Sequence, residues 1–149
     1  MRVLVQRSKN SKVTINGKVH GKIDHGYVLL VGFTQGDNDN IIDKMIDKII
    51  HLRIFEDENG KMNLSIIDTN GQILSISQFT LYANAKEGRR PAFNEALPAD
   101  KASILYDSFN EKLSKFIHVE TGIFGSDMKV EIYNDGPVRI MLDSKELFK

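Results

Sequence analysis

Polar residues that could do chemistry fall in three short segments, the first of which lies within an otherwise apolar stretch. Ser75, Ser77, Gln78 and Thr80 interrupt the hydrophobic residues of segment 72–82. Because apolar residues fall on both faces of this predicted strand, its polar groups should be buried with it. A buried polar group without a partner costs about 1–3 kcal/mol. These side chains therefore either satisfy one another or line a pocket, and the pattern leaves both interpretations open.

The second segment is the run Asn134-Asp135-Gly136-Pro137, directly before the apolar stretch 138–142. This composition is typical of a sharp turn, which needs no function of its own. A Gly-Pro pair at this place would put two rigid carbonyl groups at the end of a sheet. X–Pro bonds are cis in only about 5–6% of cases, so a cis bond here would be a specific feature.

The third segment, Lys86-Glu87-Gly88-Arg89-Arg90-Pro91, is a local basic patch in a chain of balanced charge. Twenty Lys and Arg residues against 20 Asp and Glu residues give a formal net charge of zero. Any contact with nucleic acid must therefore come from a local patch or from shape. Flexible cations beside a glycine suit phosphate contacts, although a solvated loop has the same composition.

The usual machinery of nucleophilic and metal catalysis is missing. The absence of cysteine excludes thiolate zinc sites, iron–sulfur clusters and cysteine nucleophiles. No nucleophile elbow, Walker A loop or dinucleotide-binding fingerprint occurs. We expect no metal and no cofactor, because no acidic cluster is present and the histidines lack metal-ligand spacing. They are His20, His25, His51 and His118.

Hydrophobic periodicity predicts the elements that must position these segments. A helix is expected over about 39–51 and a second from 98 or 100 to about 117. A long loop over 83–98 is expected between the strand 72–82 and the second helix. The predicted strands cover 2–6, 12–15, 19–23, 26–33, 72–82, 128–133 and 138–142, and Asn16-Gly17 predicts a tight hairpin turn between the second and third of them. Strands at both ends with helices between them predict a single α/β or α+β domain over residues 1–149. No apolar run approaches the roughly 20 residues of a membrane span and no signal peptide is evident, so a cytoplasmic location is expected.

Together these segments resemble the D-aminoacyl-tRNA deacylases of the bacterial and eukaryotic type, over essentially the whole chain. One signature of that family is Ser77-Gln78-Phe79-Thr80-Leu81, and the other is Asn134-Asp135-Gly136-Pro137-Val138. Either signature alone would be weak, but both occur here in order with further landmarks around them. Those landmarks are residues 1–7, 26–32, 53–57, 88–93 and 121–128.

The resemblance implies an enzyme that hydrolyses the ester between a D-amino acid and the 3′-terminal adenosine of tRNA. It also implies a homodimer with the active site at the subunit interface, and a mixed or antiparallel sheet with a barrel-like core and two main helices. The family's Gly-Pro peptide is cis and enters the pocket of the opposite subunit. Carried over to Gly136 and Pro137, this motif would crowd an L side chain and leave a D side chain free.

The resemblance also suggests roles for the remaining site residues. The backbone N–H groups around Phe79 and Thr80 would stabilise an oxyanion, while Ser77, Gln78 and Phe79 would shape the adenosine and amino-acid pocket. The Thr80 hydroxyl is a less favoured nucleophile, because no base stands near it in sequence. The resemblance also implies that the substrate's own 2′-hydroxyl helps to activate water. Lys86, Arg89 and Arg90 would contact acceptor-stem phosphates.

The chain departs from the family pattern at two positions. Three other functions also stay open, of which the first rests on one of these departures. Arg139 stands where Thr is usual, and Ala92 stands where Ser is usual. Arg139 keeps open a related deacylase that acts on mischarged L-alanyl-tRNA. The second alternative is a dimeric tRNA-binding module without turnover. The third is a structural α/β protein, which would leave the paired signatures unexplained.

Overall fold

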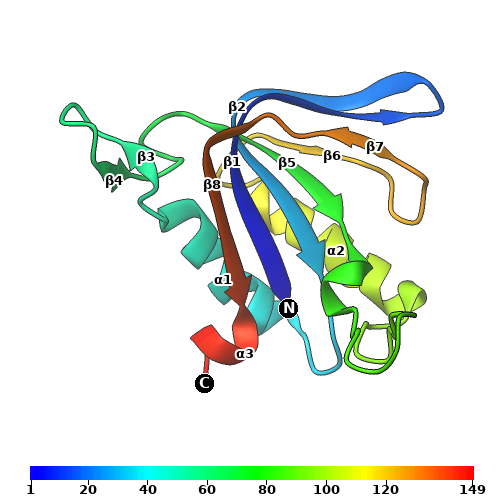
Figure 1. The fold of residues 1–149 in the computed structure, drawn as a ribbon. Coiled ribbons are helices and arrows are strands. Elements are labelled where there is room, and N and C mark those ends of the chain that lie inside the picture. The colour runs from blue at the N-terminus through cyan, green and yellow to red at the C-terminus, as the bar shows by residue number, and fades with distance from the viewer.

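Two long antiparallel strands, β1 (Arg2–Ile15) and β2 (Lys18–Gly32), form the centre of the sheet. The computed structural model describes residues Met1–Lys149 (Figure 1). The predicted turn between the strands lies at Asn16-Gly17, where both φ angles are positive, as a tight hairpin turn requires. The sequence predicts each strand as two shorter pieces, and this is wrong. Asn10 and Gly26 take up the bends with positive φ angles while the two strands remain paired on either side.

The rest of the sheet is mixed. β5 (Gln72–Ser77) runs parallel to β2, and β6 (Val119–Thr121) runs parallel to β5. β7 (Lys129–Glu131) and β8 (Asn134–Asp143) pair antiparallel with different parts of β1. The strand order is β6-β5-β2-β1-β7, with β8 also on β1. The mixed sheet is confirmed, but the barrel-like core is not, because no strand joins the β6 edge to the β7 and β8 edge.

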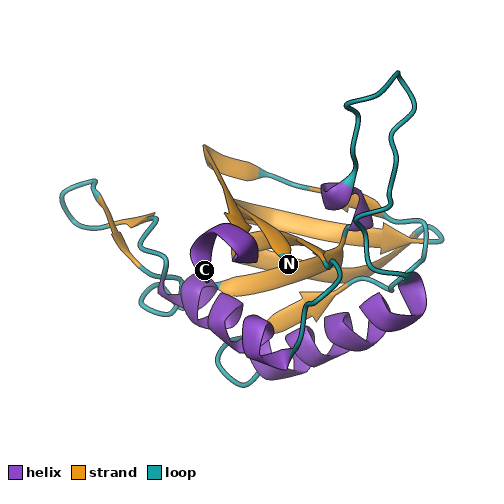
Figure 2. Ribbon diagram, turned by 90° about the horizontal axis from the view of Figure 1, so that it is seen from below, coloured by secondary structure: helices purple, strands orange, loops and turns teal.

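Two helices cover one face of this sheet (Figure 2). α1 (Asp39–His51) matches the prediction, and its N-cap Asn38 accepts a hydrogen bond from the Ile41 N–H. α2 (Ala99–Leu113) ends earlier than predicted, because the chain tightens into a turn in which Phe116 N–H donates to the Leu113 carbonyl. The small elements are the strands β3 (Phe55–Glu56) and β4 (Met62–Leu64), the 3₁₀ turn η1 (Phe79–Tyr82) and α3 (Ser144–Leu147). No helix has the length and hydrophobicity needed to cross a membrane.

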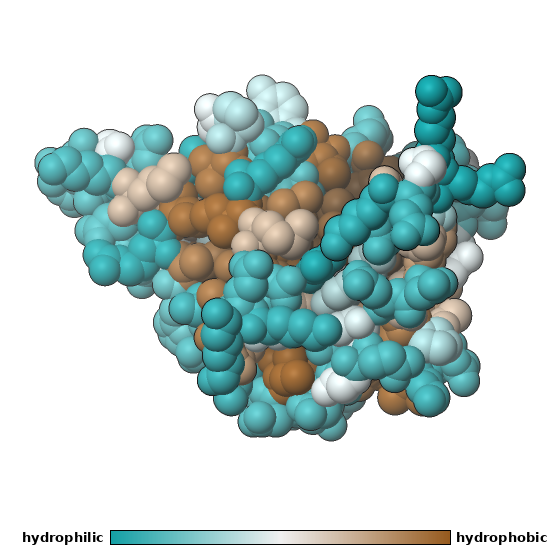
Figure 3. Space-filling view, turned by 60° about the horizontal axis from the view of Figure 1, so that its bottom comes forward, coloured by the Kyte–Doolittle hydropathy of each residue, from teal (hydrophilic) through white to brown (hydrophobic).

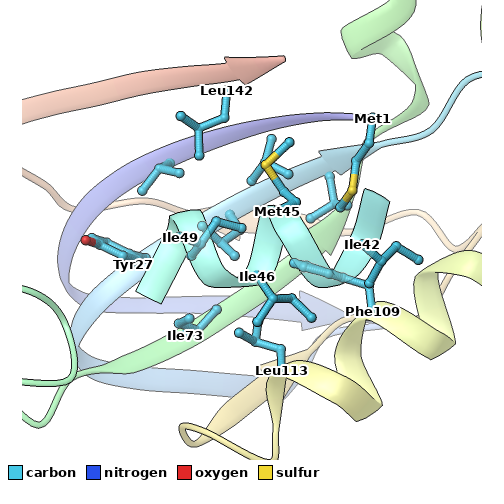
Figure 4. Close-up of a cluster of buried hydrophobic side chains, with 14 of the residues drawn as sticks. Met1, Tyr27, Ile42, Met45, Ile46, Ile49, Ile73, Phe109, Leu113 and Leu142 are labelled. Atoms are coloured by element: carbon cyan, nitrogen blue, oxygen red, sulfur yellow. The ribbon is translucent and has the colours of Figure 1, made fainter. Parts of the chain in front are cut away.

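The main core lies between the helices and the sheet, where α1 and α2 contribute Ile42, Met45, Ile49, Phe109 and Leu113 (Figure 4). A smaller cluster on the other face gathers Val13, Ile23, Val28, Leu74 and Ile76. That face carries no helix, so part of its apolar surface remains open. Figure 3 shows hydrophobic side chains gathered on one side of the molecule, and the exposed apolar residues include Met141 and Phe79.

Candidate active site

A pocket of about 590 Å³ opens where β2 and β5 end. β5 stops at Ser77, so the predicted strand over 72–82 is wrong beyond that residue. Gln78 N–H still donates to the Val31 carbonyl at 2.7 Å, and the chain then turns into η1. A Cβ on Gly32 would lie 2.9 Å from the Gln78 carbonyl oxygen. Glycine at position 32 therefore allows the backbone of Gln78 to lie against β2.

The turn after β5 presents backbone donors beside the pocket. Phe79 and Thr80 occupy the first positions of the 3₁₀ turn, where N–H groups have no partner within the helix itself. The Gln78 side-chain amide donates to the Thr80 hydroxyl, and that hydroxyl donates no hydrogen bond to a carboxylate or an imidazole. The site therefore offers N–H donors for a developing negative charge, while the Thr80 hydroxyl has no adjacent base.

An aromatic pair forms one wall of this pocket. The rings of Phe79 and Phe93 meet edge to face, with centroids 5.1 Å apart and an interplanar angle of 62°. Phe79 is 56% exposed and Phe93 is 37% exposed, an unusual arrangement for two large apolar side chains. Exposed aromatic rings beside a pocket suit stacking against a nucleobase.

Ser75, grouped with the other polar residues by sequence, lies outside the pocket. It is fully buried, and its hydroxyl has no hydrogen-bond partner. Its carbonyl accepts a hydrogen bond of 2.7 Å from the Tyr106 hydroxyl, whose pKa is raised by burial. Among the polar residues of this segment, the structure brings Ser77 and Gln78 to the pocket and leaves Ser75 in the core.

The Asn134–Pro137 segment is the start of β8 rather than a turn, so the predicted turn is wrong. The Gly136–Pro137 peptide bond is cis, and both residues are exposed. The Asn134 side-chain amide donates to the Arg7 carbonyl at 2.9 Å and to the Val138 carbonyl at 3.0 Å. These two bonds hold the segment at the edge of β1.

Arg7 is a buried cation in the site whose role is not evident from residue type and spacing. Its Nε donates to the Asp135 carbonyl at 3.1 Å, and its Nη1 donates to the Ile54 carbonyl at 2.8 Å. A Cβ on Gly136 would lie 2.8 Å from Nη2 of Arg7. The guanidinium therefore holds the backbone at Asp135 and lies directly against Gly136. A buried arginine is rare without such partners, but sequence alone does not say where its partners lie.

One chain does not bring the two signatures together. Ser77 pairs with Val31, Val31 with Val3, and Val3 with Leu142. Pro137 lies five residues before Leu142 on β8. With about 3.3 Å per residue along a strand and about 4.8 Å between strands, the two signatures are separated by about 20 Å.

The basic segment projects from the body of the molecule, as the long loop in Figure 2 shows. Its base is closed by a bridge between Asn84 and Ala92, directly before the pocket residue Phe93. Lys86, Arg89 and Arg90 are all exposed. The three cations therefore lie on a projecting loop whose base is next to the pocket.

The sequence did not predict the remaining parts of the pocket, because their residue types suggest no chemistry. They come from the end of β2, from the loop before α2 and from 124–128. The last of these belongs to a landmark of the family resemblance, but it carries no catalytic spacing of its own. Asp127 in this segment pairs with Lys129 at 2.8 Å. Nowhere in the structure do three His, Asp or Glu side chains come together in an arrangement that could hold a metal.

Comparison with known proteins assigns this fold and site to a class. The sequence model of the D-Tyr-tRNA(Tyr) deacylase family matches residues 4–143. A D-aminoacyl-tRNA deacylase of Geobacillus sp. (strain WCH70) is 58% identical over 147 residues, covering 98% of this chain and 97% of the relative. A D-aminoacyl-tRNA deacylase of Sulfurihydrogenibium sp. (strain YO3AOP1) is 53% identical over 147 residues, covering 99% of this chain and 100% of the relative.

Solved structures share the architecture. The c-Myc DNA Unwinding Element Binding Protein superposes with a TM-score of 0.91 at 39% identity, covering 96% of this chain and 98% of that one. A structure described as a probable eukaryotic D-amino acid tRNA deacylase has a TM-score of 0.83 at 18% identity and covers 95% of this chain and 97% of that one. At this identity the similarity supports the fold alone.

The class is therefore that of hydrolases that act on ester bonds. Within it, the chain belongs to the D-Tyr-tRNA(Tyr) deacylase family. This confirms the resemblance that the paired signatures predicted, and the expectation that the protein is an enzyme.

Proposed function

We propose that this protein hydrolyses the ester of D-aminoacyl-tRNA, releasing the free D-amino acid and the tRNA. The observation that carries the proposal is the pocket at the end of β5, which Phe79 lines, together with the unpaired backbone N–H groups of Phe79 and of its neighbour Thr80 at the start of η1. An ester carbonyl placed there has donors for the charge that develops on its oxygen. The exposed Phe79–Phe93 pair supports stacking of the terminal adenine on the same rim.

In the reaction, the oxygen of a water molecule bonds to the ester carbon while the carbonyl oxygen becomes an oxyanion. The N–H groups of Phe79 and Thr80 donate to that oxyanion, and one such donor is typically worth about 2.7–4 kcal/mol. The bond from carbon to the ribose 3′-oxygen then breaks, and the proton from water passes to the 3′-oxygen. The substrate's 2′-hydroxyl lies next to this oxygen and assists the proton transfer. Ser77 and Gln78 shape the pocket, and the Thr80 hydroxyl is not required as a nucleophile.

We propose that the chiral filter works between two copies of this chain. The separation of about 20 Å between Pro137 and Ser77 supports this, because a single chain places the two signatures too far apart to share a ligand. The exposed Gly136 and Pro137, and the open apolar face beside them, support insertion into the pocket of a partner subunit. There the motif excludes an L side chain by contact and leaves a D side chain free.

The direct test is a paired deacylation assay on D-tyrosyl-tRNA and L-tyrosyl-tRNA with substoichiometric enzyme. Multiple turnovers of the D ester with the L ester intact are expected. Binding of tRNA without turnover of either ester would overturn the proposal in favour of a binding module. Cleavage of L-alanyl-tRNA in preference to the D ester would point to the related L-alanyl activity.

The basic loop gives a second prediction. Replacing both Arg89 and Arg90 by alanine should raise KM for D-tyrosyl-tRNA about tenfold, because two phosphate contacts are lost. The slope of log(kcat/KM) against log salt concentration should flatten by about 1–2 units. Steady-state kinetics at several salt concentrations measure both. A fall in kcat with KM and the salt slope unchanged would contradict this role for the loop.

A chiral filter that works by excluding L side chains should not exclude glycine. Glycine has no side chain to exclude, so we expect glycyl-tRNA to be cleaved slowly at high enzyme concentration while L-tyrosyl-tRNA stays intact. A time course of radiolabelled glycyl-tRNA with and without enzyme measures this. Complete protection of glycyl-tRNA would contradict a purely steric filter.

A further inference from the structure

Arg139 is a cation that nothing in the chain neutralises. It lies on β8 two residues after Pro137 and is exposed. Its guanidinium takes part in none of the side-chain hydrogen bonds or ion pairs of the structure. Arg2 on β1, in contrast, is paired with Asp143 on β8 at 2.9 Å. Side chains alternate along a strand, so Pro137, Arg139 and Met141 lie on the open face of the sheet, away from α1 and α2.

The residue opposite Arg139 also lacks an acceptor. Arg139 pairs with Gln6 across β1 and β8, and directly opposed side chains share one face. Gln6 is only 2% exposed, and its Nε2 has no hydrogen-bond partner. The next pair on this face, Leu4 and Met141, is apolar. No carboxylate of the chain is paired with the Arg139 guanidinium beside this buried amide, so the cation is left free for an anion from outside the chain.

We propose that Arg139 binds a backbone phosphate at the 3′ end of the tRNA held in the partner's pocket, and so selects the nucleotide part of the substrate. This inference rests on the proposed function and its cross-subunit motif. Two residues on one face of a strand are about 7 Å apart, so the Arg139 side chain starts within reach of whatever Pro137 contacts. The 5′-phosphate of the terminal adenosine is separated from the esterified 3′-oxygen by only the ribose and one methylene. Arginine suits such a phosphate, because its fork can donate two parallel hydrogen bonds.

A phosphate fits the patch better than the other anions that could reach it. The only carboxylate lining the pocket is Asp127, and that group is already paired with Lys129 at 2.8 Å. A partner subunit therefore offers no free carboxylate at the pocket for Arg139. An acidic amino-acid side chain would have to enter a pocket whose lining is mostly apolar and contains Asp127. The phosphate, in contrast, is present in every aminoacyl-tRNA.

The test uses two small substrates, 3′-O-(D-tyrosyl)adenosine and the same ester carrying a 5′-phosphate. The wild-type protein should cleave the phosphorylated ester with a kcat/KM about tenfold higher. In Arg139→Gln this ratio should fall close to one, and in Arg139→Lys it should be intermediate. Lys115→Gln removes the same charge from an exposed position after α2 and should keep the wild-type ratio. Because each variant is compared with itself on two substrates, a general loss of activity does not change the readout.

The possible outcomes separate this inference from its premise. Equal cleavage of the two esters by the wild-type protein, or an unchanged ratio in Arg139→Gln, overturns the phosphate contact and leaves the proposed function standing. Loss of the dimer in Arg139→Gln by light scattering, with the ratio unchanged, assigns Arg139 to the interface instead. A preference for D-aspartyl- over D-asparaginyl-adenosine that disappears in Arg139→Gln, again with no phosphate preference, assigns it to an acidic side chain. Cleavage of neither ester overturns the proposed function and this inference with it.

Discussion

Replacing Gly136 by alanine is expected to lower kcat/KM for D-tyrosyl-tRNA by about 100-fold or more, because displacement of a positioning group by about 1 Å can cost that much. The added Cβ would lie 2.8 Å from Nη2 of Arg7 and 2.8 Å from Cγ2 of Val138. Gly136 also has a φ of 128°, which L side chains rarely adopt. The backbone that carries Pro137 must therefore shift. Initial rates on the D and L esters measure the loss, and circular dichroism checks that the chain is folded.

A mixing experiment tests whether this motif acts in the partner subunit. Gly136→Ala damages the motif, whereas Gly32→Val damages the pocket, because even a Cβ at Gly32 would lie 2.9 Å from the Gln78 carbonyl. After subunit exchange, half of the dimers should be mixed, and each mixed dimer has one site with an intact pocket and an intact motif. About one quarter of wild-type activity should therefore return. If mixed dimers form and no activity returns, the motif acts within its own chain.

Replacing Phe79 by alanine is expected to reduce kcat/KM for D-tyrosyl-tRNA roughly 10- to 100-fold, with little change in stability. Base stacking on an aromatic side chain is worth about 1–3 kcal/mol, and the substitution removes that surface while keeping the backbone N–H of residue 79. Phe79 is 56% exposed and touches Phe93, so its truncation leaves no large internal cavity. Kinetics on D-tyrosyl-tRNA and urea unfolding measure the two quantities.

Phe116 provides a matched control for this experiment. It is 59% exposed, lies just after α2, and is not among the residues that line the pocket. Phe116→Ala removes the same apolar surface and should leave kcat/KM within about twofold of wild type, as is usual for surface substitutions. Equal losses in the two variants would contradict a stacking role for Phe79 and indicate a general effect of lost aromatic surface.

Local patterns determined the elements that depend on local physics. The 3.6-residue period of apolar residues in 41–50 was enough to predict α1 correctly. The Asn16-Gly17 turn was equally clear, because few residue pairs tolerate positive φ at both positions. The predictions failed where tertiary contacts override local preference. β5 ends at Ser77 because the following backbone lies against Gly32 and turns, although the apolar run continues to Tyr82.

The chemistry of the site divides in the same way. Residue types and their order were enough to identify the family through its two signatures, and they pointed to Ser77–Thr80, Gly136-Pro137 and the basic loop. The folded chain, in contrast, shows that Ser75 belongs to the core, that Arg7 contacts the backbone of the Gly-Pro segment, and that the two signatures lie far apart in one chain. Strand pairing between distant segments sets which side chains share a face and how far apart they lie, whereas residue types and their spacing report only what neighbours along the chain can do.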